Sequence, residues 1–216
     1  MIKSDLITKM IEKFITALIE IENLKINKKY DEAIKVIDST LSDIFRLNLK
    51  SFNSLKDEYL LEIIRVNDLI DAERYIIISV LLEKEAEIIE INGDYNQCHL
   101  IFTKALNMRL EAYIINDEPE LLKFYSQIPI LIDKISGYEF SELTNLKLLK
   151  YYEGTQNFGK SEDILYELLQ SKNNDIAIVN LGISFYERLL KKDSATLEKG
   201  GLPREEVKDA LKKLQS

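Results

Sequence analysis

Apolar residues recur along almost the whole chain at spacings of three, four and seven residues, the period of a helix that buries one face. The 216 residues include only 7 Gly and 3 Pro, too few turn residues for an all-β fold. The chain is therefore predicted to be all-α, with about ten helices. They are expected near 5–26, 30–44, 55–66, 71–91, 95–115, from 119, 141–154, 158–169, 176–192 and from 203, the last preceded by a short helical segment over 194–199.

Several residues mark where these helices should begin, break or end. Ser54 and Ser141 are expected N-caps for the helices that follow them, because a serine side chain can accept a hydrogen bond from a free backbone amide. Gly93 supplies the positive φ that closes a helix. Pro129 removes a backbone donor and should kink or divide the segment that starts near Pro119.

The same short pattern opens three of the predicted helices. An aromatic residue is followed three positions later by a small residue and four positions after that by a large apolar one. Successive small residues lie 65 and 63 positions apart. The small residue lets two helices approach closely, and the aromatic is expected to fill the gap beside the turn. The three sets are Tyr30, Ala33 and Ile37; Tyr95, Cys98 and Phe102; Phe158, Ser161 and Leu165.

The middle set resembles a tetratricopeptide repeat. The residues on the motif's positions are Ala86, Ile89, Gly93, Tyr95, Cys98, Phe102, Ala105 and Leu106. Glu85 departs from the motif, which has a large apolar residue there. The spacing is about twice the 34 residues of such a repeat. The resemblance implies one α-solenoid domain over 1–216, in three hairpin-plus-one-helix units near 5–67, 71–136 and 141–193, with a capping helix over 203–215.

The end of the chain carries a second resemblance. The segments ISFYERLLKKD, from Ile183, and LEKGGLPREEVKDAL, from Leu197, are similar to the C-terminus of an uncharacterised, clostridia-type bacterial family of tetratricopeptide-like fold. That resemblance implies a bacterial source and no particular activity.

The net charge and the hydropathy of the chain argue against nucleic acids and membranes as partners. The net charge of −8 and the absence of a basic stripe argue against nucleic acid as a partner. The longest strongly apolar run, Tyr75–Leu82, is far shorter than the roughly 20 residues of a membrane span. Because the N-terminus also lacks the pattern of a secretory signal, a cytoplasmic location without membrane contact is expected.

No catalytic, cofactor or metal site is predicted. Cys98 and His99 are adjacent and diverge by about 100° on a helix, so they cannot face one substrate. We interpret Cys98 as a small interface residue and His99 as a surface or groove residue. The segment Gly154–Ser161 matches the spacing of a phosphate-binding P-loop, but a predicted helix precedes it instead of the strand that such a loop requires.

The predicted partner surface lies on the helix over 71–91. Glu83, Glu87 and Glu90 fall on one face of that helix at four- and three-residue spacing. In the resembling family, the corresponding positions line a concave groove that grips peptides. With Val80 and Ile91 these glutamates would form an acidic, partly apolar strip for a basic or amphipathic peptide.

The sequence thus favours a non-enzymatic scaffold or adaptor that binds a peptide segment in a concave groove. One alternative is a regulatory peptide-sensing module whose output lies in another protein. Another is a nucleotide-binding enzyme that uses Gly154–Ser161. Homodimerisation stays open as well, because the ends of a solenoid expose apolar surface unless they are capped.

Overall fold

The computed structural model describes residues 2–64, 72–115 and 121–215, with the side chains of 2–6 excepted. Every regular element in this part of the chain is a helix, which confirms the all-α prediction. No helix in these ranges combines the length and apolarity of a membrane span. The expected helix end at 66 and the expected helix starts at Asp71 and Pro119 lie outside the described residues. The contacts divide the chain into two compact units, Met1–Tyr138 and Glu139–Ser216.

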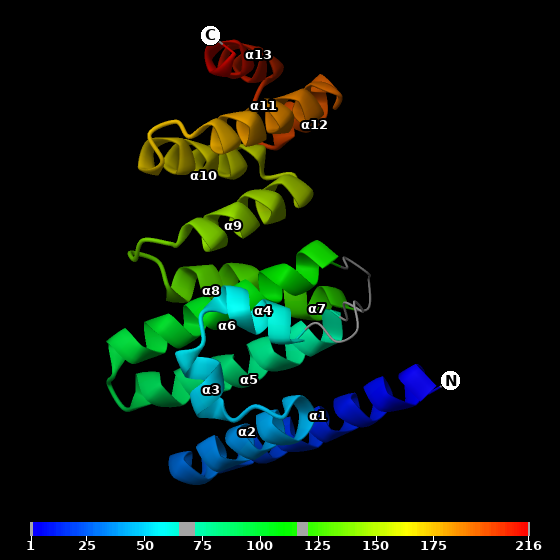
Figure 1. Cartoon of the computed structure of the whole chain (residues 1–216), viewed down its shortest axis with the longest axis vertical. Helices are drawn as coiled ribbons and strands as arrows, with labels where there is room; N and C mark the ends of the chain where they lie inside the picture. The colour runs from blue at the N-terminus through cyan, green and yellow to red at the C-terminus, as the bar shows by residue number, and fades with distance from the viewer. Residues whose placement is uncertain (1, 65–71, 116–120, 216) are drawn as a thin grey trace. The chain divides into compact units, whose positions relative to one another are not determined.

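The first unit contains α1 to α8 (Figure 1). Its centre is the hairpin of α5 and α6, against which α8 also packs. The helix bounds are α1 Ile2–Ile26, α2 Tyr30–Phe45, α3 Leu49–Ser54, α4 Asp57–Ile64, α5 Ala72–Ile91, α6 Tyr95–Ile115, α7 Leu122–Tyr125 and α8 Ile128–Lys134.

The second unit contains α9 to α13 (Figure 1). Two pairs of helices dominate its packing, α9 with α10 and α11 with α13. The helix bounds are α9 Glu142–Gly154, α10 Phe158–Ser171, α11 Ile176–Leu190, α12 Ser194–Lys199 and α13 Arg204–Leu214.

Local signals placed many of these ends correctly. Ser141 accepts a hydrogen bond from the Thr144 amide and caps α9. Gly93 adopts a φ of 83° between α5 and α6. Pro129 lies in the first turn of α8, and the segment is divided there into α7 and α8, as predicted.

The repeated pattern also appears in the structure. Tyr30, Tyr95 and Phe158 begin α2, α6 and α10, the second helices of three hairpins. The residues three and seven positions later are buried in each case: Ala33, Cys98, Ser161, Ile37, Phe102 and Leu165. The aromatic position differs between hairpins, because Phe158 is fully buried whereas Tyr95 is 64 % exposed. Tyr95 therefore does not fill the gap beside its turn.

The predicted start of the third helix is wrong, although α4, Asp57–Ile64, lies within the predicted range of 55–66. A short helix, α3, ends at Ser54, where a helix was expected to begin, and the next helix starts only at Asp57. The N-cap of α3 is Asn48, whose side chain accepts a hydrogen bond from the Ser51 amide at 2.8 Å. The Ser54 hydroxyl instead donates back to the carbonyl of Lys50, as serines inside helices do.

The turn before α13 is held against the start of α10. The carbonyl of Gly200 accepts a hydrogen bond from the Gly159 amide at 3.0 Å. A Cβ on Gly200 would lie 2.2 Å from Cδ2 of Phe158 and 2.6 Å from the carbonyl oxygen of Gln156. The glycine pair near the C-terminus therefore permits a close approach of two backbone segments inside the second unit.

Substitution of the two neighbouring glycines separates packing from backbone strain. We expect Gly200→Ala to destabilise the second unit by about 3 kcal/mol, because the buried Phe158 ring has no room to move. Gly201→Ala should cost only about 1 kcal/mol, since its φ is 77° but a Cβ there would meet nothing within 4 Å. Urea denaturation of both variants checks this order, and equal losses would contradict it.

Candidate functional site

The three glutamates of the predicted acidic strip are each engaged by a cation of the chain itself. Glu83 accepts a hydrogen bond at 2.6 Å from Arg109, a residue of α6 whose side chain is 1 % exposed. Two further pairs join α5 to neighbouring helices, Glu87 with Lys25 of α1 and Glu90 with Lys134 of α8 at 2.7 Å, and Glu87 also pairs with Lys84 of α5 itself. These carboxylates therefore hold helices together within the first unit.

The side chains of the two apolar residues of the predicted strip differ in their exposure to solvent. Val80 is 8 % exposed and belongs to the core, whereas Ile91 is 55 % exposed at the end of α5. The strip thus offers a ligand one accessible apolar side chain and carboxylates that are already neutralised. Its attraction for a basic peptide is correspondingly reduced, because each internal ion pair would have to break.

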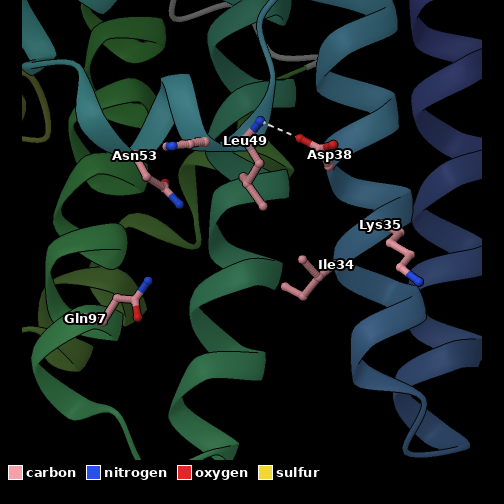
Figure 2. Close-up of a pocket in the computed structure, with 7 residues that line it drawn as sticks. Ile34, Lys35, Asp38, Leu49, Asn53 and Gln97 are labelled. Atoms are coloured by element: carbon pink, nitrogen blue, oxygen red, sulfur yellow. Dashed lines mark hydrogen bonds between the residues drawn. The ribbon is translucent and has the colours of Figure 1, made fainter.

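A different surface of the first unit is hollowed. A groove of about 470 Å³ lies between α2, α3 and α6, lined by Ile34, Lys35, Asp38, Leu49, Lys50, Asn53 and Gln97. Ile34 and Leu49 point into the space between α2 and α6, and Gln97 lies on its α6 side (Figure 2). The groove therefore combines an apolar centre with polar groups at its edges.

The charged side chains around this groove differ in whether they have a partner within the described part of the chain. Asp38 accepts a hydrogen bond from the Leu49 amide at 2.7 Å and so fixes the start of α3 to α2 (Figure 2). Lys35 and Lys50 are exposed, and neither forms an ion pair within the described part of the chain. An acidic protein thus places two available ammonium groups beside an apolar groove.

Behind the groove, a carboxyl group is buried in the first unit. Glu85 of α5 is only 3 % exposed, and its Oε1 accepts a hydrogen bond from Nδ2 of Asn53 at 2.6 Å. Its second oxygen, Oε2, and Oδ1 of Asn53 are both buried without a hydrogen-bond partner. Because Asn53 also lines the groove, this pair connects the groove wall to the core.

Lys104 of α6 completes this buried polar cluster. Its Nζ donates to the carbonyls at the end of α3, at 2.7 Å to Phe52, 3.2 Å to Asn53 and 2.6 Å to Leu55. It also lies 3.9 Å from Asp57 of α4. A cation at the C-terminus of a helix satisfies carbonyls that have no partner inside that helix. Lys104 therefore caps α3 through a side chain about fifty residues away in the sequence.

Burial dominates the electrostatics of the cluster. It raises the pKa of Glu85 to about 7, against the smaller lowering effects of the Asn53 hydrogen bond and the charge of Lys104. Burial likewise lowers the pKa of Lys104, and the charges of Asp57 and Glu85 oppose that shift. Glu85 is therefore a carboxyl group that changes charge near neutral pH.

The P-loop-like segment is used for packing. The Ser161 hydroxyl is fully buried and donates to the carbonyl of Leu149, and the amides of Gly159 and Ser161 donate to the carbonyls of Gly200 and Asn157. A phosphate cradle needs such amides free to point at the ligand. The geometry therefore argues against the nucleotide-binding alternative.

Cys98 and His99 also have structural surroundings. Cys98 is buried, and its Sγ lies 3.3 Å from the carbonyl of Tyr95, which fits the predicted interface role. The half-buried ring of His99 stacks on Tyr138 with 3.6 Å between centroids, and burial lowers its pKa. Among the described residues, no three His, Cys, Asp or Glu side chains gather as metal ligands would.

Comparison with known proteins places the chain in a family. Residues 1–216 match a family of unknown function, DUF6483, and the chain belongs to that family. No curated protein and no solved structure matches it. Because membership of this family carries no activity, a function has to be inferred from the groove and its surroundings.

The paired glutamates predict an unequal response to neutralisation. Glu83→Gln should destabilise the first unit by about 3 kcal/mol, because it leaves the buried guanidinium of Arg109 without a counterion. Glu90→Gln, which removes a partly exposed pair, should cost less than about 1 kcal/mol. Urea denaturation measures both. A loss for Glu83→Gln no larger than that for Glu90→Gln would show that Glu83 is not a structural residue.

Proposed function

For this member of the DUF6483 family, we propose a non-enzymatic role as a protein-interaction module that binds a peptide segment. The groove between α2, α3 and α6 is the surface that supports this proposal best. A tetratricopeptide-like repeat is part of the same proposal. It is supported by the common register of Tyr30, Tyr95 and Phe158 at the starts of α2, α6 and α10.

The composition of the groove suggests the chemistry of the peptide. The half-buried Ile34 offers apolar contact to a side chain in the centre, and the buried Leu49 forms the floor beside it. Lys35 and Lys50 offer charges that no carboxylate of the described residues takes up. The exposed side chain of Gln97 can hydrogen-bond a peptide backbone. We therefore propose a peptide in which an apolar residue is flanked by Asp or Glu.

The internal pairing of Glu83, Glu87 and Glu90 is what moves the proposed surface away from α5. A basic peptide on that face would compete with Arg109, Lys25 and Lys134 for the same carboxylates. At the groove, by contrast, a ligand would meet two lysines that no carboxylate of the described residues pairs with, and one carboxylate, Asp38, that already accepts from the Leu49 amide. Charge complementarity therefore favours an acidic ligand even though the chain carries a net charge of −8.

A displayed library of random twelve-residue peptides tests the proposal. Peptides that wild type selects should combine apolar residues with Asp or Glu. The double variant Lys35→Glu/Lys50→Glu should bind them at least tenfold more weakly, because each attraction becomes a repulsion. Fluorescence anisotropy of labelled peptides measures the affinities.

The matched control reverses two exposed lysines of the second unit, Lys150→Glu/Lys212→Glu, which changes the net charge equally. That variant should bind within about twofold of wild type after correction for ionic strength. The proposal is wrong if no peptide is selected, or if the selected peptides bind the groove variant as tightly as the control variant.

A further inference from the structure

Asn53 belongs both to the groove and to the buried cluster behind it. Its side chain lines the groove and donates through Nδ2 to Oε1 of Glu85 at 2.6 Å. Leu49 and Lys50, two further lining residues, lie on the same short helix, α3. The position of α3 therefore determines the shape of one groove wall.

The Asn53–Glu85 pair is left with one unsatisfied atom on each side chain. Oδ1 of Asn53 and Oε2 of Glu85 are both acceptors when the carboxyl group is ionised, and both are buried without a partner. A proton on Oε2 converts one of them into a donor. The acid and the amide can then form two reciprocal hydrogen bonds, and neither side chain keeps a buried acceptor without a hydrogen bond.

We propose that protonation of Glu85 holds α3 against α5, which we call the seated state. Loss of this proton lets α3 move away from α5, the open state, and loosens the wall of the groove. An ionised Glu85 keeps only the hydrogen bond from Asn53 and carries a charge into an environment that is 3 % exposed. Opening of α3 exposes that charge to water. Ionisation therefore favours the open position, because water solvates a carboxylate far better than the protein interior does.

The charges around Glu85 set the size of this effect. From α6, the Lys104 ammonium attracts the carboxylate, but it is already bonded to three carbonyls and shared with Asp57 of α4. From α3, the neutral side chain of Asn53 donates a hydrogen bond to the group. On the neighbouring helices, Lys25 of α1 pairs with Glu87, and Asp38 of α2 accepts from the Leu49 amide.

The direction of the pH effect follows from proton binding. With α3 seated, Glu85 keeps its proton up to a pKa of about 7, whereas a carboxyl group exposed to water loses it near 4.5. The seated state therefore binds more protons between these values, and its stability falls as pH rises through this interval. Above about pH 7 the stability no longer changes through this group.

Amide hydrogen exchange at α3 measures the fastening directly. The Phe52 and Leu55 amides donate to the carbonyls of Asn48 and Ser51 inside α3 and report whether it is seated. Between pH 5.5 and 6.5, their protection factors in wild type, corrected for intrinsic exchange, should fall by close to tenfold. In Glu85→Gln they should stay constant, because the Gln amide makes both hydrogen bonds with Asn53 at any pH.

Two other groups require controls. The chain has one histidine, so His99→Gln removes the ordinary source of titration near pH 6.5, and the pH dependence at α3 should persist in that variant. Burial also raises the pKa of Glu162 in the second unit. Exchange is therefore measured at amides of α3, because the stability of the whole protein would also respond to the titration of Glu162. Protection that is independent of pH in wild type overturns the proposal. A pH dependence that persists unchanged in Glu85→Gln does so as well.

The consequence for ligand binding depends on the proposed function of the groove, and the exchange measurement does not. Peptides selected by wild type should bind more weakly at pH 7.5 than at pH 5.5, by the ratio of the seated fractions of α3 that the exchange measurement gives at the two pH values, and Glu85→Gln should remove that difference. If the protection factors of the α3 amides depend on Glu85 but no peptide binds, protonated Glu85 does hold α3, and the proposed ligand is wrong. If the seated fraction of α3 changes with pH but the affinity for the peptide does not, the coupling to the groove is wrong.

Discussion

The six residues of α3 are held in place by polar side chains from three other helices, and one groove wall depends on that hold. A helix of this length has no stability of its own in water. Asp38 of α2 accepts from its first amide, Lys104 of α6 caps its last carbonyls, and Glu85 of α5 binds Asn53 in its last turn. Lys104 and Glu85 are both titratable and largely buried, so any change in their protonation acts on α3 directly.

This arrangement explains why the resemblance to a tetratricopeptide repeat departs where it does. The repeat has a large apolar residue at the position of Glu85. In this chain the position faces an additional helix, and a carboxyl group replaces apolar contact by a hydrogen bond. The penalty of burying that group is what makes the contact sensitive to pH. The same helix closes one side of the groove for which an acidic ligand is proposed, since its lysines pair with no carboxylate of the described residues.

Most predictions from local signals were correct, the N-cap at Ser54 excepted, whereas contacts between distant residues were missed. Gly93, Pro129 and Ser141 mark helix ends through their own backbone chemistry, and the structure places those ends as predicted. The pairing of Glu83 with Arg109 spans 26 residues and that of Glu87 with Lys25 spans 62, so no periodicity could reveal them. The groove was missed for the same reason, because α3 owes its position to distant side chains. Its only visible trace in the sequence was the misplaced carboxyl group of Glu85.

A double-mutant cycle on Asn53→Ala and Glu85→Ala at pH 6 tests the central interaction most directly. If the protonated pair fastens α3, the two single changes remove the same contact. The free energies of unfolding should then show a coupling of about 1–2 kcal/mol. Losses that add to within about 0.3 kcal/mol would show that the two side chains stabilise the protein independently. In that case the Asn53–Glu85 pair does not fasten α3.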